Sequence, residues 1–418
     1  MFILISTEGQ PKSKFRWQKG MLLLILALFM VTATGCFGLF PKAPHEEMIA
    51  AAKKTNNLKE LGYIAEMSFR IKSEDPELAT FNQILNEISI PFSINVDKKE
   101  KRGQVGFSVL YKGVDCGNLL LYADRERISA QSNFLGEKVF FFAWNDLQPL
   151  IQRYFNLQIQ LTDYFPLLFE TKRKTSRQAE TAIYDLYTDF YADHLTAGQK
   201  KVDVTITDGQ QGETIVCKEI ILQMGYEDLS LEESNRYFQT LLENEAILAL
   251  LQEKITQLVT IAKDNGDLAT WPVTEEDLLS FRDNLDAFLA ELATMIFTEQ
   301  QATQAVQPQT SLQGKFRIDR RGFLRNMVLS QVMEFNNLPT EEPLLVEVFT
   351  EANLVNPRHE LTFTDFSGAE LVDVGKLSAA DGTVIGEEVA MNFINQLMFN
   401  PLIQDIVLLS GLLDSEVY

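Results

Sequence analysis

The side chains that most often carry out catalysis are scarce in this chain and show no catalytic spacing. None of the three histidines, His45, His194 and His359, lies in an HExxH pattern or shares a helical face with another. The sequence also has no GxSxG nucleophile elbow, phosphate-binding glycine loop or GxGxxG turn. We therefore predict no catalytic residues, no metal site and no cofactor. An enzyme assembled from scattered acidic residues is the alternative that pattern searching leaves open.

One cysteine has a distinctive chemical context. Cys36 follows three small residues, Ala33-Thr34-Gly35, which end an apolar run that begins at Met21. A positive start, an apolar run and a small-residue ending are the three parts of a secretory signal peptide. The positive start consists of Lys12, Lys14, Arg16 and Lys19.

The small residues before Cys36 resemble the lipobox of bacterial lipoproteins, in which cleavage precedes the cysteine and its sulfur carries a diacylglycerol. The resemblance implies that residues 1–35 are a signal peptide and that Cys36 is lipidated. It also places residues 36–418 on the outer face of the cytoplasmic membrane. The alternative is an uncleaved anchor, because residues 21–40 have about the length of a bilayer-spanning helix. The preceding Lys and Arg residues predict export of the C-terminal part in both cases.

The charge balance excludes one class of partner. The chain has a formal net charge of −21. Without residues 1–35 it keeps 33 Lys and Arg against 57 Asp and Glu, a net charge of −24. Such a surface repels nucleic acid, whose binding depends on neutralising phosphates. Hydrophobic residues make up 46% and aromatic residues 10% of the chain, which excludes a disordered protein.

Two further cysteines, Cys116 and Cys217, lie in segments with strand character. Export permits a disulfide between them. The sequence leaves two alternatives open, a Cys116–Cys217 disulfide or two buried thiols.

The pattern of residues 36–225 predicts a tether followed by a β-rich unit. Residues 36–56 read as a lipid-anchored tether with a short helix. Residues 57–225 form the β-rich α+β unit, in which residues 92–96 and 105–111 alternate between apolar and polar side chains. Closely spaced strands of this kind predict an antiparallel meander with hairpin turns.

The pattern changes to helical in residues 226–300. We predict one helix from Leu231 to about Lys263 and a second from Thr274 to about Thr298, joined as a central αα-hairpin. Residues 301–312 are Gln-rich and read as a linker or loop. Residues 313–418 are predicted to supply further strands, including residues 359–366, and a C-terminal helix that Pro401 breaks. The pattern does not decide whether all strands share one sheet.

These elements predict an α+β fold with an antiparallel sheet, curved in one interpretation, and covering helices. The order resembles exported lipoproteins of Gram-positive bacteria that have no assigned activity. It is similar in plan to carriers of the LolA and LppX type, whose curved sheet and helices enclose an apolar ligand. Our leading hypothesis is therefore a membrane-anchored binding protein for a lipid or another apolar ligand.

This hypothesis depends on the phenylalanine-rich strands. Residues 139–144 (VFFFAW) carry apolar side chains on both faces, so that one face can pack the core and the other a ligand. We predict Phe140, Phe142 and Phe107 as ligand-facing residues. The alternative function is a cell-surface structural or protein-interaction module without a small ligand.

Overall fold

The structure is a computed structural model that describes residues 43–72, 82–136, 138–155, 159, 163–164, 167, 173–208, 211–302, 308–336, 343–355, 361–366 and 368–414. The predicted signal peptide, Cys36 and His359 lie outside the described residues.

The described strands form a single 13-stranded sheet with the order β13-β6-β5-β4-β3-β2-β1-β12-β11-β10-β9-β7, and β8 also pairs with β9. The strand pairs are antiparallel except for β13 and β6. The strands are β1 (Glu60–Lys72), β2 (Ile88–Asp97), β3 (Arg102–Tyr111), β4 (Val114–Ala123), β5 (Arg127–Gln131), β6 (Lys138–Ala143), β7 (Leu195–Ala197), β8 (Val202–Asp208), β9 (Gln211–Met224), β10 (Gln309–Asp319), β11 (Leu324–Phe335), β12 (Leu344–Leu354) and β13 (Glu370–Asp373).

The two β-rich segments of the sequence meet in the middle of this sheet. β1 pairs with β12, and Tyr63 lies opposite Leu354. The question of one sheet or two is thereby answered in favour of one. The α+β class with an antiparallel meander and covering helices is confirmed.

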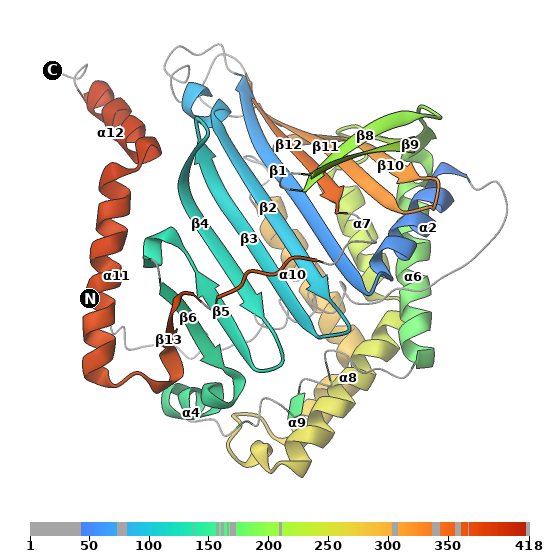
Figure 1. Cartoon of the computed structure of the whole chain (residues 1–418). Coiled ribbons are helices and arrows are strands. Elements are labelled where there is room, and N and C mark those ends of the chain that lie inside the picture. Colours follow the sequence, from blue (N-terminus) through green and yellow to red (C-terminus); the bar gives the residue numbers. More distant parts are fainter. Residues whose placement is uncertain are drawn as a thin grey trace.

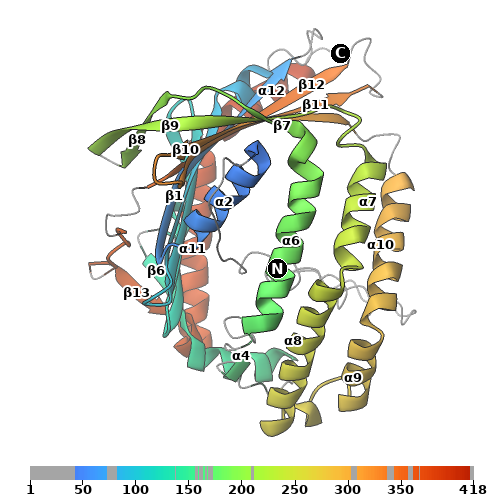
Figure 2. The same ribbon diagram turned by 90° about the vertical axis from the view of Figure 1, so that its right-hand side faces the viewer.

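Helices lie on one side of the curved sheet, and strands β8–β12 arch over α2 (Figures 1 and 2). We call the face of the sheet that contacts α2 the concave face. The helices are α2 (Pro44–Asn56), α4 (Trp144–Phe155), α6 (Arg173–Tyr191), α7 (Leu231–Leu242), α8 (Glu245–Asp264), α9 (Glu275–Asp283), α10 (Leu285–Ala302), α11 (Ala379–Phe399) and α12 (Pro401–Asp414).

The core of the fold lies where α2 meets β9 and β10. Ile220, Leu222 and Phe316 point from the sheet toward Ala51 of α2, and each is at most 8% exposed. Burial of such side chains is worth about 1.5–3 kcal/mol each. This packing fixes the position of α2, which in turn contacts α6.

The helical hairpin has two more breaks than the sequence analysis predicts. The predicted helix from Leu231 is divided at Asn244, whose side chain caps α8 by accepting hydrogen bonds from the N–H groups of Ala246 and Ile247. The second predicted helix is divided at Asn284 into α9 and α10. Asparagine favours such positions because its side chain competes for backbone groups. The prediction of two uninterrupted helices was wrong.

Two predicted boundaries also differ from the structure. Residues 301–302 end α10 and residues 309–312 belong to β10, so the predicted linker 301–312 is shorter than expected. Leu312 pairs with Met224 and packs against the core, which explains why this polar segment becomes a strand.

Residues 361–366, which belong to a predicted strand, are not a strand in the structure. They cross the face of the sheet opposite the helices, where Thr364 N–H donates to the Gln104 side chain at 2.8 Å.

Helices α11 and α12 stand along the β4 end of the sheet (Figure 1). As predicted, the helix breaks at Pro401, which is the first residue of α12. Asn400 Nδ2 donates to the Cys116 carbonyl at 2.6 Å, and Asp405 Oδ2 accepts from the Tyr111 hydroxyl at 2.6 Å and from Lys112 Nζ at 2.9 Å. These polar contacts hold α12 against the β3–β4 hairpin.

The Asp405 contacts predict that α12 loosens in acid. Hydrogen bonds from Tyr111 and Lys112 hold the pKa of Asp405 below its ordinary value. The stabilisation is therefore complete above the ordinary pKa of about 4 and is lost as the pH falls below it. The protection of residues 401–408 against hydrogen exchange, measured relative to the intrinsic exchange rate at each pH, should fall below about pH 4. Asp405→Asn should give the same loss of protection at neutral pH. Glu387→Gln, on the exposed side of α11, serves as the control and should change nothing; equal exchange in all three proteins would contradict this role of Asp405.

Candidate functional site

One row of apolar residues crosses the concave face of the sheet from β9 to β4. Each residue of the row is the direct cross-strand partner of the next, so their side chains share one face. The row is Ile220, Phe316, Met327, Ala352, Ala65, Phe92, Phe107 and Leu119.

Exposure changes sharply along this row. Ile220 is fully buried and Ala65 is 2% exposed, whereas Phe107 is 41% exposed. Three neighbours of Phe107 on the same face of β3–β5 are similarly exposed: Val105 at 41%, Leu121 at 38% and Ile128 at 37%. Val105 pairs directly with Leu121, so these side chains are contiguous. We call Val105, Phe107, Leu121 and Ile128 the open apolar surface.

The packing of the helices explains why this surface is open. α2 contacts β7, β10 and β11, and α6 contacts α2. Helices α7–α10 pack mainly on one another and on α6 rather than on the strands. The helical layer is thus joined to the sheet at its β9–β11 end (Figure 2). Among the described helices, none packs on β3 or β5 to this extent, and α12 alone does so on β4.

A second helical element borders the open apolar surface at the other end. Gly117 lies opposite Val109 on the concave face, and a Cβ atom there would come within 2.6 Å of the Phe134 ring. Phe134 in turn contacts Phe393 of α11, with ring centroids 5.6 Å apart. Glycine at position 117 thereby permits close packing of Phe134, and through it of α11, at this edge.

The opposite face of the sheet has a different chemistry. Across β9–β12, Arg317 Nη1 donates to Asn326 Oδ1 at 2.9 Å, and Asn326 Nδ2 donates to Glu351 Oε1 at 2.8 Å. Arg317 Nε also donates to Glu219 Oε2 at 3.3 Å. A polar network of this kind needs no apolar cover. At β9–β12 the two faces of the sheet therefore differ clearly in polarity.

The predicted ligand-facing phenylalanines lie on the concave face. Phe140 pairs with Ala130 and Phe142 with Ile128, which places both beside the open apolar surface. Both are half-buried, and Phe107 is the most exposed of the three. The intervening Phe141 points to the other face, where the Arg127 guanidinium lies 5.3 Å from its ring centroid.

Sequence reasoning missed Val105, Leu121 and Ile128. The alternation of residues 105–111 contains the signal for Val105, because it shares a face with Phe107. Leu121 lies in an unbroken apolar run, which does not indicate the face of the sheet on which each side chain lies.

The disulfide alternative is contradicted by the structure. Cys116 and Cys217 are both buried free thiols. They belong to β4 and β9, and six strands lie between these in the sheet. A disulfide needs Cα atoms within about 7 Å, less than two strand spacings. Burial raises the pKa of Cys217 to about 11, so its thiol is protonated at neutral pH.

The two histidines in the described part of the chain lie in separate elements. His45 lies in the first turn of α2, and His194 Nδ1 lies 3.7 Å from Asp228 Oδ2. No three His, Cys, Asp or Glu side chains of the described residues are grouped so that they could hold a metal ion.

Comparison with known proteins adds no assignment. No protein-family model matches the sequence, and no curated protein matches it significantly. Within the described ranges, no helix is both long and apolar enough to cross a bilayer.

Proposed function

We propose that this chain is a lipid-anchored extracytoplasmic protein that binds a lipid or another apolar ligand against the concave face of its sheet. The observation that carries the proposal is the exposure of Phe107 and its neighbours on a face that is packed against α2 at its β9–β11 end. At 25 cal/mol per Å², each 100 Å² of apolar surface that a ligand covers is worth about 2.5 kcal/mol. An acyl chain supplies such a surface without requiring polar partners.

The proposed location rests on the Ala33-Thr34-Gly35-Cys36 ending, which resembles a lipobox. α2 begins at Pro44, eight residues after Cys36. An extended segment of eight residues spans at most about 28 Å. A lipidated Cys36 would therefore keep α2, and the sheet that packs on it, close to the membrane that supplies apolar ligands.

Native mass spectrometry tests the proposal on protein extracted gently from its own membrane. We expect a reproducible adduct with the mass of a lipid or another apolar molecule, which disappears on denaturation. A clean native mass in repeated preparations would contradict the binding function.

One observation favours the alternative, a cell-surface interaction module. α11 presents Val384, Met391, Ile394 and Met398 at helical spacing, with exposures of 47–64%. They lie mainly on the side of α11 opposite Phe393, whose ring contacts Phe134. An apolar stripe of this kind is typical of a protein-binding helix. A protein partner that copurifies with the unmodified chain but not with Met391→Asp would support this function. If Met391→Asp instead loses a lipid adduct, the interaction module is not supported.

A further inference from the structure

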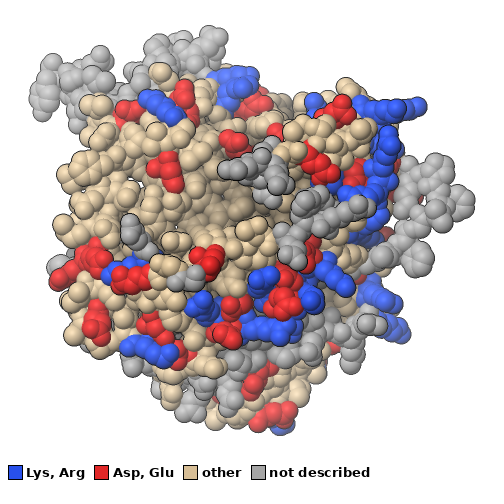
Figure 3. All heavy atoms as spheres, in the orientation of Figure 1, with Lys and Arg blue, Asp and Glu red and all other residues tan. Residues whose placement is uncertain are grey.

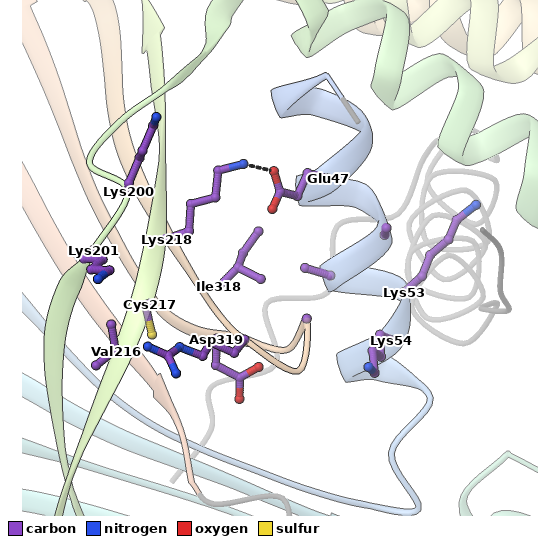
Figure 4. Close-up of a pocket in the computed structure, with 14 residues that line it drawn as sticks. Glu47, Lys53, Lys54, Lys200, Lys201, Val216, Cys217, Lys218, Ile318 and Asp319 are labelled. Atoms are coloured by element: carbon purple, nitrogen blue, oxygen red, sulfur yellow. Dashed lines mark hydrogen bonds and ion pairs between the residues drawn. The ribbon is translucent and has the colours of Figure 1, made fainter. Parts of the chain in front are cut away.

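A pocket of about 660 Å³ lies between α2, the β10–β11 turn, β9 and the segment before β8 (Figure 4). It is distinct from the open apolar surface, which lies on β3–β5. Its charged lining consists of Lys53, Lys54, Lys200, Lys201, Lys218, Arg320, Glu47 and Asp319.

The pocket is cationic although the chain is strongly acidic. Six Lys and Arg side chains and two carboxylates line it, in a protein of net charge −21. Figure 3 shows Lys and Arg side chains gathered along the right-hand edge of the molecule, over β8–β10 as placed in Figure 1. This concentration is the reverse of what the overall composition predicts.

Both carboxylates already have basic partners. Glu47 forms an ion pair with Lys218 across the pocket. Asp319 lies 3.5 Å from Arg321 Nε and 3.5 Å from Nη1 of Arg325, whose side chain is fully buried. Neither carboxylate is therefore available to neutralise the remaining cations.

Three of the cations have no acidic partner within the described part of the chain. Lys200, Lys201 and Arg320 are exposed and form no ion pair with a described residue. In Figure 4, Lys200 and Lys201 lie on the sheet side of the pocket, opposite α2. An anion in the pocket could form charge-assisted hydrogen bonds with these side chains without breaking an ion pair that the structure shows.

The wall beside Arg320 is held in place before any ligand arrives. Asp319 Oδ1 accepts from the N–H groups of Arg321 at 2.8 Å and Phe323 at 3.0 Å. Gly322 has a φ of 81°, which the turn requires. Leu324 N–H donates to Thr55 of α2 at 2.9 Å, and Lys54 Nζ donates to the Arg321 carbonyl. A fixed wall lowers the entropy cost of binding.

We propose that this pocket binds a phosphate group, carried by the headgroup of an anionic lipid or by a free phosphate compound. Lys and Arg side chains are the usual protein partners of phosphate oxygens. A lipid headgroup as the source of the phosphate rests on the proposed anchor at Cys36, because α2 forms one wall of the pocket and begins eight residues later. A free phosphate compound could bind without the anchor.

Calorimetric titration of the full chain in a neutral maltoside detergent tests the proposal. The probes are glycerophosphoglycerol, which is a lipid headgroup without acyl chains, inorganic phosphate, and glycerol as the phosphate-free probe. We expect Lys200→Glu with Lys201→Glu to weaken phosphate-probe binding at least about tenfold, since two attractive charges become repulsive. Lys59→Glu with Lys72→Glu makes the same charge change at exposed sites outside the pocket and should alter the affinity less than about threefold.

Each outcome has a defined meaning. Tighter binding of glycerophosphoglycerol than of phosphate supports the lipid headgroup as the source, and equal or tighter binding of phosphate supports a free phosphate compound. Absence of binding by both probes, binding of glycerol, or equal losses in the two double variants would overturn the proposal. Because no probe has an acyl chain, failure here leaves the apolar-ligand function standing, and Phe107→Ser should bind these probes normally.

Discussion

Replacing Phe107 with serine is expected to weaken the binding of an acyl-chain ligand roughly 10- to 30-fold. Phe107 is 41% exposed, which leaves about 80 Å² of its side chain for a ligand to cover, worth up to about 2 kcal/mol. Titration of residues 37–418 with a fatty acid whose fluorescence rises in apolar surroundings measures the effect. The fold should persist, because Phe107 belongs to none of the buried core clusters of the described residues.

Phe349 provides a matched control for this substitution. It is 39% exposed, but it pairs with Ser68 and Ser330 and so lies on the opposite face of the sheet. Phe349→Ser should leave ligand affinity unchanged within about twofold. If the two variants lose affinity equally, or if Phe107→Ser binds like the unmodified chain, the ligand does not use the concave face.

Loss of lipid attachment in Cys36→Ala is the second large effect that we expect. Acylation of a lipobox cysteine occurs on the thiol sulfur, which alanine lacks. Incorporation of labelled palmitate should therefore fall to background, and the chain should no longer be recovered with a diacylated residue 36 at its N-terminus. Mass spectrometry of the denatured protein from membrane fractions measures both the acyl group and the N-terminal residue.

Cys116→Ala is the control for this experiment. Cys116 is a buried free thiol in β4, so its removal should leave palmitate incorporation intact. A chain that retains Met1 and carries no acyl group in the unmodified protein would support the uncleaved anchor at residues 21–40 instead.

The class of fold was predictable from local pattern, whereas the pairing of distant strands was not. Alternation at residues 92–96 and 105–111 identified β2 and β3, because side chains of a half-buried strand repeat every second residue. The pairing of β1 with β12 joins Tyr63 to Leu354, and no local pattern specifies so distant a partner. The single sheet therefore emerged only from the structure.

The candidate site was predictable in part for the same reason. Alternation places Phe107 on one face, but whether that face is covered depends on where helices far along the chain pack. α2 and α6 cover Ile220 and leave Phe107 open, although both side chains belong to one row. The breaks at Asn244 and Asn284 were missed because the apolar periodicity continues across them.

The sequence indicated only part of the basic pocket. Arg317, Arg320, Arg321 and Arg325 cluster around one turn, which indicates a basic hairpin. The structure separates their roles. Arg325 is buried beside Asp319, and Arg317 belongs to the polar network of the opposite face. Arg320 alone of the four lines the pocket, together with lysines from α2 and β9 and from the segment before β8.

Photo-crosslinking from position 107 tests the central claim most directly. Benzoylphenylalanine is placed at position 107 in one variant and at position 349 in another. Both proteins are irradiated in the producing cells, and their peptides are analysed by mass spectrometry. We expect an apolar adduct on the peptide containing residue 107 and none on the peptide containing residue 349. Adducts at position 349 alone, or at neither position, would contradict a ligand site on the concave face.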